Sequence, residues 1–326
     1  MRVGIAGAGA WGTALALAAC RAGHAVGLWA HRRETADAIA RTGESPYLPG
    51  IPLPEAVAAT TDIAETAACD LLLLVTPAQH LRATCVALAP HWRPGTPPVI
   101  CAKGIEQGSG ELLGDIVAAT LPGVPWLVLS GPTFAREVAE ERPSAATVAA
   151  HDATLAAEVA AGLATRRFRL YSSTDPVGVQ IGGAVKNVVA IAAGVVEGRR
   201  LGDNARAALI TRGLAEIGRL AAALGAEPRT LMGLAGLGDL TLTCSAMQSR
   251  NFSLGAALGA GRGLDEILGE RTSVAEGVWT ARSVATLARS RGVDMPICFA
   301  VEAVLHGGAD LGATIEGLLA RPYVAE

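Results

Sequence analysis

The sequence has few aromatic residues, no excess of positive charge and no closely spaced cysteines. Only 4% of its 326 residues are Phe, Trp or Tyr, whereas 51% are hydrophobic. The core must therefore consist mainly of Ala, Leu and Val, which favours α/β or all-α packing. The net charge of −3 and the pI near 6.1 give no support to nucleic acid or an anionic membrane surface as a partner.

The cysteines and other metal-binding residue types are scattered along the chain. None of the six cysteines is part of a C-x-x-C motif, and no compact group of His, Asp and Glu is present in the sequence. We therefore expect buried, reduced thiols in a cytoplasmic protein, and no metal site.

An uncharged run near the N-terminus is similar in length to a membrane segment. Residues 3–20 carry no charge and lie between Arg2 and Arg21, a pattern that signal peptides share. The four glycines in this run would weaken a helix, and a spanning helix requires at least about 18 apolar residues. We expect no targeting segment and no membrane span.

The same run contains a glycine-rich turn between a strand-like and a helix-like segment. Its sequence is Gly7-Ala8-Gly9-Ala10-Trp11-Gly12, a G-x-G-x-x-G pattern. In dinucleotide-binding folds the first glycine permits the tight turn, the second lets the backbone approach a pyrophosphate, and the third brings helix and strand together. The pattern predicts a nucleotide site at the helix N-terminus; a glycine-rich turn without a ligand is the alternative.

Several further apolar runs predict a parallel sheet in the first half of the chain. The run Asp70–Pro77 is uniformly apolar over most of its length, as expected for a strand covered on both faces. Similar or alternating patterns occur at 25–30, 99–102, 126–130, 144–150 and 167–171, and residues 43–54 read as an irregular connection. We predict a doubly wound, mainly parallel α/β Rossmann domain over residues 1–173.

The second half of the chain has a helical pattern. Residues 183–197, 204–224, 276–290 and 297–306 read as helices, and no convincing strand is found. We predict an all-α domain over residues 174–326, with the boundary in a turn-rich stretch.

Basic residues follow the second predicted strand. His31-Arg32-Arg33 occupies the place where an NAD-specific unit usually has an Asp or Glu for the ribose hydroxyls, whereas an Arg accommodates a 2′-phosphate. The trio favours NADP(H) over NAD(H). A solvated charged loop is the alternative.

Polar residues at four further places suggest chemistry. Lys103 and the segment Gly131–Ala135 each follow a predicted strand, where open α/β sheets bind ligands. Lys186 lies in an otherwise apolar helix, where an ammonium group needs a partner such as Asp239 or a ligand. A lysine that extends to solvent is the alternative. Arg250-Asn251 offers a planar fork and an amide that suit a phosphate monoester; a solvated turn is again the alternative.

These motifs, in this order from residue 3 to residue 320, closely resemble the bacterial-type NAD(P)-dependent glycerol-3-phosphate dehydrogenases. The resemblance is carried by G-A-G-A-W-G, Y-L-P-G, V-T-P, A-K-G-I-E, S-G-P-T-F-A, G-G-A-V-K-N, N-A-R-A-A-L-I-T-R-G-L-A-E, G-L-G-D-L, S-R-N and V-A-E-G-V. It implies reversible reduction of dihydroxyacetone phosphate to sn-glycerol 3-phosphate in the cytoplasm, which supplies phospholipid synthesis. The substrate is a small phosphorylated molecule, and a homodimer is compatible with the sequence.

The resemblance also implies roles for residues at matching positions. Lys186 is similar to the catalytic acid/base, with Asp239 and Thr243 in support. Implied substrate contacts are Lys103, Gly131, Thr133, Lys186, Asn187, Asp239, Ser249, Arg250 and Asn251. Implied cofactor contacts are Gly7, Gly9, Ala10, Trp11, Gly12, His31, Arg32, Lys103, Ala135, Arg250, Val274 and Glu276.

Two departures from the family pattern bear on the site. Arg199-Arg200 lies in a loop that is usually richer in glycine, and Phe252 stands where a basic residue is frequent. Two other functions remain as alternatives. A 3-hydroxyacid or 2-ketoacid reductase of the same architecture would prefer a carboxylate substrate, and a dinucleotide-binding redox sensor would have no use for Lys186, Asp239 and Arg250 together.

Overall fold

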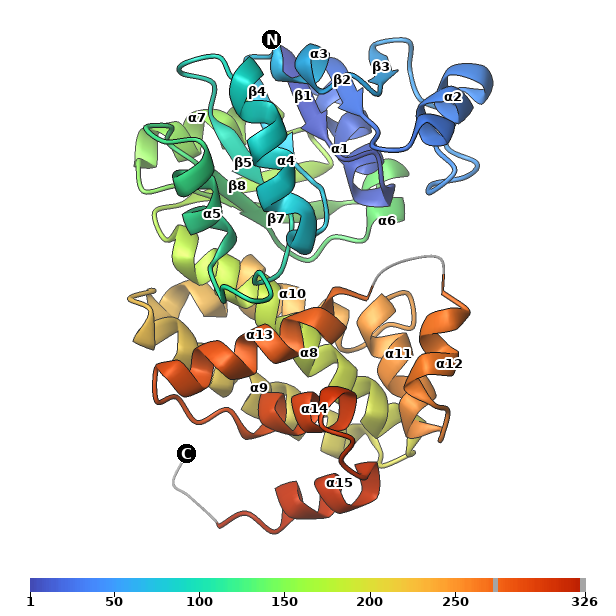
Figure 1. Cartoon of the computed structure of the whole chain (residues 1–326), viewed down its shortest axis with the longest axis vertical. Helices are drawn as coiled ribbons and strands as arrows, with labels where there is room; N and C mark the ends of the chain where they lie inside the picture. The colour runs from blue at the N-terminus through green and yellow to red at the C-terminus, as the bar shows by residue number, and fades with distance from the viewer. Residues whose placement is uncertain (272–274, 323–326) are drawn as a thin grey trace. The chain divides into compact units, whose positions relative to one another are not determined.

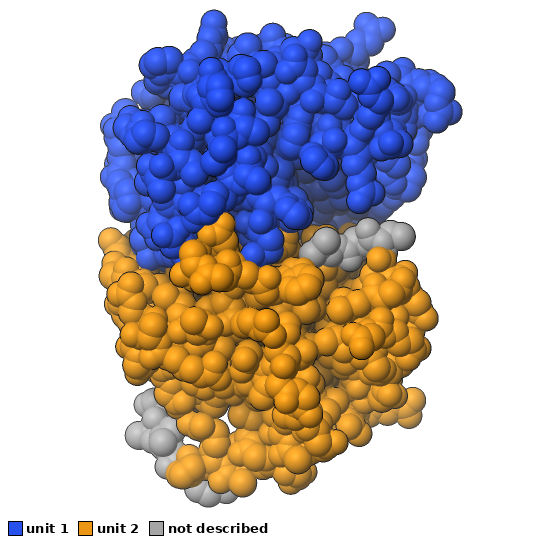
Figure 2. Space-filling view, viewed as in Figure 1, with its two compact units in different colours: residues 1–103, 111–180 blue, residues 104–110, 181–326 orange. Residues whose placement is uncertain are grey.

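The computed structural model describes residues 1–271 and 275–322, which form two compact units (Figure 2). The units are Met1–Lys103 with Glu111–Gln180, and Gly104–Gly110 with Ile181–Glu326. The division passes through helix α8 (Pro176–Gly198), whereas the sequence suggested the turn before this helix. A single continuous helix therefore contributes residues to both units.

The first unit contains an eight-stranded sheet in the order β3-β2-β1-β4-β5-β6-β7-β8. All neighbouring strands are parallel except β6 and β7, which are antiparallel. The chain order reverses on the two sides of β1 and β4, which makes their carboxyl ends a topological switch point. The strands are β1 (Arg2–Ala6), β2 (Ala25–Trp29), β3 (Val57–Thr60), β4 (Leu71–Leu74), β5 (Pro98–Ile100), β6 (Leu127–Ser130), β7 (Ser144–Ala149) and β8 (Phe168–Ser173).

Helices cover both faces of this sheet (Figure 1). Leu71 and Leu73 belong to a core cluster with residues of α1, α2, α6 and α7, while the alternate Leu72 and Leu74 are buried on the opposite face. The helices of this unit are α1 (Ala10–Arg21), α2 (Arg33–Thr42), α3 (Ile63–Ala67), η1 (Ala78–His80), α4 (Leu81–Leu88), η2 (Ala89–His91), α5 (Leu113–Thr120), α6 (Ala135–Ala139) and α7 (Ala153–Leu163).

The predicted doubly wound, mainly parallel sheet is confirmed. The uncharged run at residues 3–20 folds as β1 and α1. Strand β3 was missed because its four residues, Val-Ala-Ala-Thr, include two alanines, which have little preference for strands.

The described residues of the second unit form helices joined by loops and contain no named strand, as predicted. The sequence missed α10, α11, α12 and α15, which are short or contain several glycines. Besides α8, its helices are α9 (Asp203–Ala223), η3 (Pro228–Met232), the π-helix η4 (Leu234–Gly238), α10 (Asp239–Thr243), α11 (Arg250–Gly259), α12 (Leu264–Gly269), α13 (Glu276–Ser290), α14 (Pro296–His306) and α15 (Leu311–Leu319).

Helix α8 is the one helix among the described residues that is long and apolar enough to cross a membrane. Every residue of its apolar window is buried inside the protein, so its composition is that of a core helix. Glycines let α11 pack closely against it. A Cβ at Gly194 would lie 2.0 Å from the Phe252 carbonyl oxygen, and one at Gly255 would lie 1.9 Å from that of Ile191. These contacts hold α11 against the C-terminal half of α8.

The six cysteines are free thiols, and all except the half-buried Cys20 are buried. Burial raises the pKa of Cys69 and of Cys85 to about 11, and that of Cys244 to about 12. These thiols therefore remain protonated and unreactive at neutral pH.

Candidate active site

In the glycine-rich turn between β1 and α1, the fold itself requires glycine at positions 7 and 12 but not at position 9. Gly7 has φ +128°, and a Cβ there would lie 2.9 Å from the Thr76 backbone nitrogen. A Cβ at Gly12 would lie 1.8 Å from the Gly7 carbonyl oxygen. A Cβ at Gly9 would have no protein atom within 4 Å. The open space at Gly9 fits the close approach of a dinucleotide pyrophosphate to the backbone.

The N-terminus of α1 offers hydrogen-bond donors to that space. Gly9 is the N-cap residue and has no side chain to cap the helix, and the first turn contains no acidic residue. The backbone N–H groups of Ala10, Trp11 and Gly12 have no acceptor within the helix. These donors and the positive end of the helix dipole favour an anion.

Basic side chains follow β2, which pairs with β1. His31 and Arg32 are exposed, and Arg32 is the N-cap residue of α2. The His31 ring lies edge-on to Trp29, with ring centroids 5.8 Å apart. His31 and Arg32 therefore lie directly after the carboxyl end of β2, where the sequence placed them.

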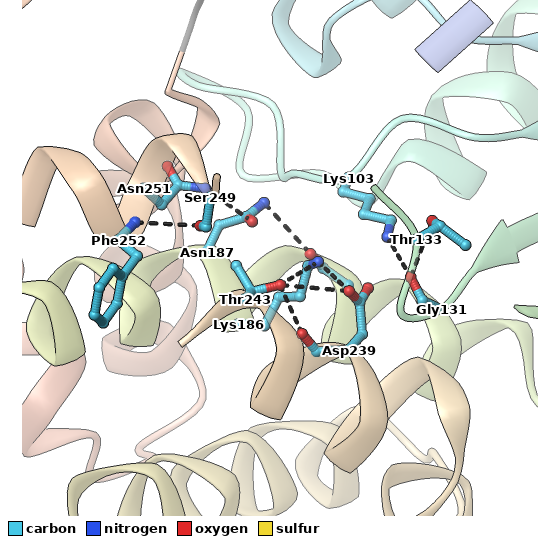
Figure 3. Close-up of polar contacts among 11 residues, drawn as sticks. Lys103, Gly131, Thr133, Lys186, Asn187, Asp239, Thr243, Ser249, Asn251 and Phe252 are labelled. Atoms are coloured by element: carbon cyan, nitrogen blue, oxygen red, sulfur yellow. Dashed lines mark hydrogen bonds and ion pairs between the residues drawn. The ribbon is translucent and has the colours of Figure 1, made fainter. Parts of the chain in front are cut away.

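Three predicted residues of the first unit meet at one carbonyl group (Figure 3). Lys103 Nζ donates a hydrogen bond of 3.1 Å to the Gly131 oxygen, and Thr133 Oγ1 donates one of 3.2 Å to the same atom. Lys103 follows β5 and Gly131 follows β6, and these strands are adjacent and parallel. Their carboxyl ends therefore place both segments at one edge of the sheet. Ala135 begins α6 directly after this segment.

The second unit holds a buried lysine and its partners (Figure 3). Lys186 is only 6% exposed and lies in the middle of α8. Its Nζ donates hydrogen bonds to the Asp239 carboxylate and, over 2.8 Å, to Thr243 Oγ1. The Thr243 hydroxyl donates its own proton to the Asp239 carbonyl oxygen over 2.6 Å. The Thr243 lone pairs therefore face the ammonium group, and the buried charge is compensated by a carboxylate.

A π-helix positions Asp239. The turn η4 ends at Gly238, and the Gly238 N–H donates to the Gly233 carbonyl oxygen over 3.1 Å. A Cβ at Gly182 of α8 would lie 2.5 Å from the Ala235 carbonyl oxygen. Glycine at 182 thus lets this π-helix approach α8 closely and brings Asp239 to Lys186. π-helices are frequent at functional sites.

A chain of amide groups links three helices beside the lysine. Asn251 Nδ2 donates to Asn187 Oδ1 over 2.9 Å, and Asn251 Oδ1 accepts from the Gly277 N–H over 3.0 Å. The backbone donor determines which end of the Asn251 amide carries the oxygen. Asn187 of α8, Asn251 of α11 and the start of α13 are therefore held in one arrangement. The sequence predicted the two asparagines as site residues. Gly277 lies in the motif V-A-E-G-V, but its N–H was not predicted as a partner of Asn251.

The start of α11 carries the predicted phosphate-binding residues. Ser249 caps this helix, since its Oγ accepts from the Phe252 N–H over 3.2 Å. Desolvation lowers the pKa of Arg250. The negative charge of Glu276, the first residue of α13, acts in the opposite direction and raises this pKa. Phe252 is 2% exposed and belongs to the core, so the departure from a basic residue at 252 removes a charge without exposing an apolar surface.

The remaining predicted residues are placed as follows. Val274 lies outside the described residues. Arg199 and Arg200 begin the loop after α8, where Arg200 has φ +57°. Glu197 of α8 pairs with Arg206 of α9 over 2.5 Å. Within 1–271 and 275–322, no group of three or more His, Cys, Asp and Glu residues is arranged to hold a metal ion.

Sequence comparison identifies the family of both units. The profile described as the NAD-dependent glycerol-3-phosphate dehydrogenase N-terminus matches residues 2–165, and the corresponding C-terminus profile matches residues 175–316. The chain belongs to the NAD-dependent glycerol-3-phosphate dehydrogenase family. Its cofactor is therefore NAD(P)H, and the activity is that of an oxidoreductase.

Individual relatives cover nearly the whole chain. The glycerol-3-phosphate dehydrogenase (NAD(P)+) of Rhodospirillum rubrum is 57% identical over 99% of this chain and 93% of its own length. The protein of the same name from Caulobacter vibrioides is 54% identical, over 100% and 98%. The crystal structure of glycerol-3-phosphate dehydrogenase from Coxiella burnetii is 39% identical with a TM-score of 0.95, over 98% of this chain and 99% of that one.

Proposed function

We propose that this protein reduces dihydroxyacetone phosphate to sn-glycerol 3-phosphate with NAD(P)H, and catalyses the reverse oxidation. The observation that carries the chemistry is the buried ammonium group of Lys186, held by Asp239 and Thr243. A charged lysine in a core helix costs folding free energy. A role as proton donor to the substrate carbonyl would explain why the protein buries a charged lysine at this position.

Reduction of a ketone adds a hydride to carbon and a proton to oxygen. Bound NAD(P)H supplies the hydride. Lys186 stabilises the alkoxide character that develops on the carbonyl oxygen and donates the proton to that oxygen. Asp239 compensates the charge of the ammonium group, and Thr243 restricts the direction of Nζ. In the reverse reaction the neutral lysine accepts the hydroxyl proton.

The other predicted residues divide between substrate and cofactor. Arg250 would bind the phosphate through its planar fork, with Asn187 and Asn251 as polar contacts and Ser249 holding the helix start. Lys103, Gly131 and Thr133, which meet at the Gly131 carbonyl group, would also contact the substrate. The turn Gly7–Gly12 would bind the pyrophosphate, with Trp11, His31, Ala135 and Glu276 as further cofactor contacts.

Arg32 supports a preference for NADP(H). It is exposed at the carboxyl end of β2, beside the glycine-rich turn at the end of the paired β1, and a guanidinium there suits a 2′-phosphate. We further propose a cytoplasmic location, a role in supply of glycerophospholipid synthesis, and assembly as a homodimer.

The test is NADPH consumption by the purified protein with dihydroxyacetone phosphate, repeated with NADH. We expect turnover with both cofactors and a higher kcat/KM with NADPH. The control substrates are 2-ketoacids, which the related reductases would prefer. Faster turnover of a 2-ketoacid than of dihydroxyacetone phosphate would reject the proposed substrate.

A further inference from the structure

Arg271 follows α12 and reaches across to the first turn of α11. Its Nη1 donates to the carbonyl oxygen of Arg250 over 2.8 Å, and its Nη2 donates to Ser253 Oγ over 3.1 Å. The Ser253 hydroxyl donates to the same Arg250 oxygen over 3.3 Å. Two side chains therefore hold the backbone of Arg250 at the point where the helix begins.

Two further arginines, Arg262 and Arg250, lie near Arg271. Desolvation lowers the pKa of Arg271, and the neighbouring charges of Arg262 and Arg250 lower it further. Arg262 is itself paired with Glu266 and Glu270, each at 2.7 Å. The hydrogen bond from Arg271 to the Arg250 backbone therefore forms although the two guanidinium charges repel each other.

Phe252 leaves the first turn of α11 without a basic side chain at position 252, and Arg271 reaches the same turn from elsewhere in the chain. The residue after Arg250 and Asn251 contributes no charge to the surface, because its ring is buried in the core. Arg271 comes from a different part of the chain, twenty-one positions later, and brings a guanidinium to the same helix turn. Its two hydrogen bonds hold the start of α11 in a way that the buried Phe252 ring does not.

We propose that Arg271 is a positioning residue that holds the backbone of Arg250, so that the Arg250 guanidinium is directed toward the phosphate group of the substrate. This inference rests on the proposed role of Arg250 as the phosphate anchor. Arg271 acts through Arg250 and is not itself a catalytic residue. Its side chain donates two hydrogen bonds with a fork that a lysine cannot reproduce.

The experiment measures binding of sn-glycerol 3-phosphate to the full chain by calorimetry, with glycerol as the uncharged comparison. Arg271→Ala should weaken sn-glycerol 3-phosphate binding about tenfold, the effect of losing hydrogen bonds that involve a charged group. Arg271→Lys keeps the charge but loses the fork, and its affinity should remain closer to that of Arg271→Ala than to wild type. Arg262→Ala, which removes a nearby charge paired elsewhere, should bind within about twofold of wild type.

A double-mutant cycle separates positioning from an independent contact. In an Arg250→Ala background, Arg271→Ala should cause no further loss of sn-glycerol 3-phosphate affinity. Additive losses, or full affinity in Arg271→Lys, would overturn the inference. Far-UV circular dichroism checks that each variant is folded.

The proposed function is tested separately by wild-type turnover of dihydroxyacetone phosphate. If wild type fails to reduce this substrate, the proposed function is wrong. If wild type reduces it and Arg271→Ala binds sn-glycerol 3-phosphate as wild type does, only the role of Arg271 is wrong.

Discussion

Lys186 and Asp239 lie fifty-three positions apart in the sequence and are joined by a hydrogen-bonded ion pair in the core of the second unit. Lys186 is 6% exposed and Asp239 1%, so each charge depends on the other. Removing one partner of a buried pair leaves an uncompensated charge, whereas a pair in solvent contributes little. This dependence makes the pair the most informative place for mutation.

Lys186→Ala should lower kcat by at least ~100-fold, the scale of a lost acid/base or oxyanion group. The affinity for NADPH, measured by fluorescence titration, should change little, because the turn that is proposed to bind the pyrophosphate lies after β1. A variant with near wild-type kcat would remove the catalytic assignment of Lys186.

Gly9→Ala should separate cofactor binding from folding. Gly9 has φ −70°, which alanine adopts readily, and its Cβ would meet no protein atom within 4 Å. The free energy of unfolding should therefore stay within about 0.5 kcal/mol of wild type. The dissociation constants of NADH and NADPH should both rise at least about tenfold, because the methyl group lies where the pyrophosphate approaches.

Gly12→Ala is the matched control for Gly9→Ala. Its Cβ would lie 1.8 Å from the Gly7 carbonyl oxygen, so this variant should lose stability in urea denaturation. Equal stability losses at the two positions would contradict the assignment of Gly9 to ligand binding.

Arg32→Ala should weaken NADPH binding about tenfold, as expected from loss of one charge-assisted contact to the 2′-phosphate. NADH lacks that phosphate, so its dissociation constant should stay within about twofold. Titration of both cofactors against the same protein preparation gives the comparison. A parallel loss for both would show that Arg32 does not determine cofactor preference.

Arg250→Lys should reduce kcat/KM for dihydroxyacetone phosphate although the charge is retained, since an ammonium group cannot form the planar fork. Wild type should use unphosphorylated dihydroxyacetone very poorly, because phosphate contacts also help to position the reacting carbon. The measurement is kcat/KM for both substrates in both proteins. Discrimination below about tenfold in wild type, or unchanged discrimination in the variant, would exclude Arg250 as the phosphate anchor.

Glu216 should make stability depend on pH. This buried carboxylate of α9 accepts the N–H groups of Ile297 and Cys298 at the start of α14, over 2.7 and 3.1 Å. Burial nevertheless raises its pKa above the ordinary value of 4.5. The folded state then holds this proton to higher pH than the unfolded state does. Its contribution to stability is present below pH 4.5 and is lost as pH rises through the folded pKa.

Glu216→Gln removes this titration and adds an offset that does not vary with pH, because an amide satisfies the two N–H groups less well. Urea unfolding from pH 4 to pH 8 should show wild type losing stability relative to the variant as pH rises. Parallel curves would mean that Glu216 titrates alike in both states.

Features carried by neighbouring residues could be predicted from the sequence. The turn Gly7–Gly12, the apolar strand at β4 and the long helices α8, α9, α13 and α14 depend on local conformation and on periodic burial. The lysine in an apolar helix could also be predicted as a special position, because burying its charge requires compensation. The resemblance of the motifs to one family identified Asp239 and Thr243 as its partners.

Only the tertiary structure decided which distant groups meet. Gly182 admits the π-helix before Asp239, the Gly277 N–H fixes the Asn251 amide, and Arg271 holds the backbone of Arg250. Each contact joins segments that are separate in the chain, and none follows from the conformation of either segment alone. The physical reason is that a glycine, an amide or an arginine is compatible with many surroundings, and packing selects the partner.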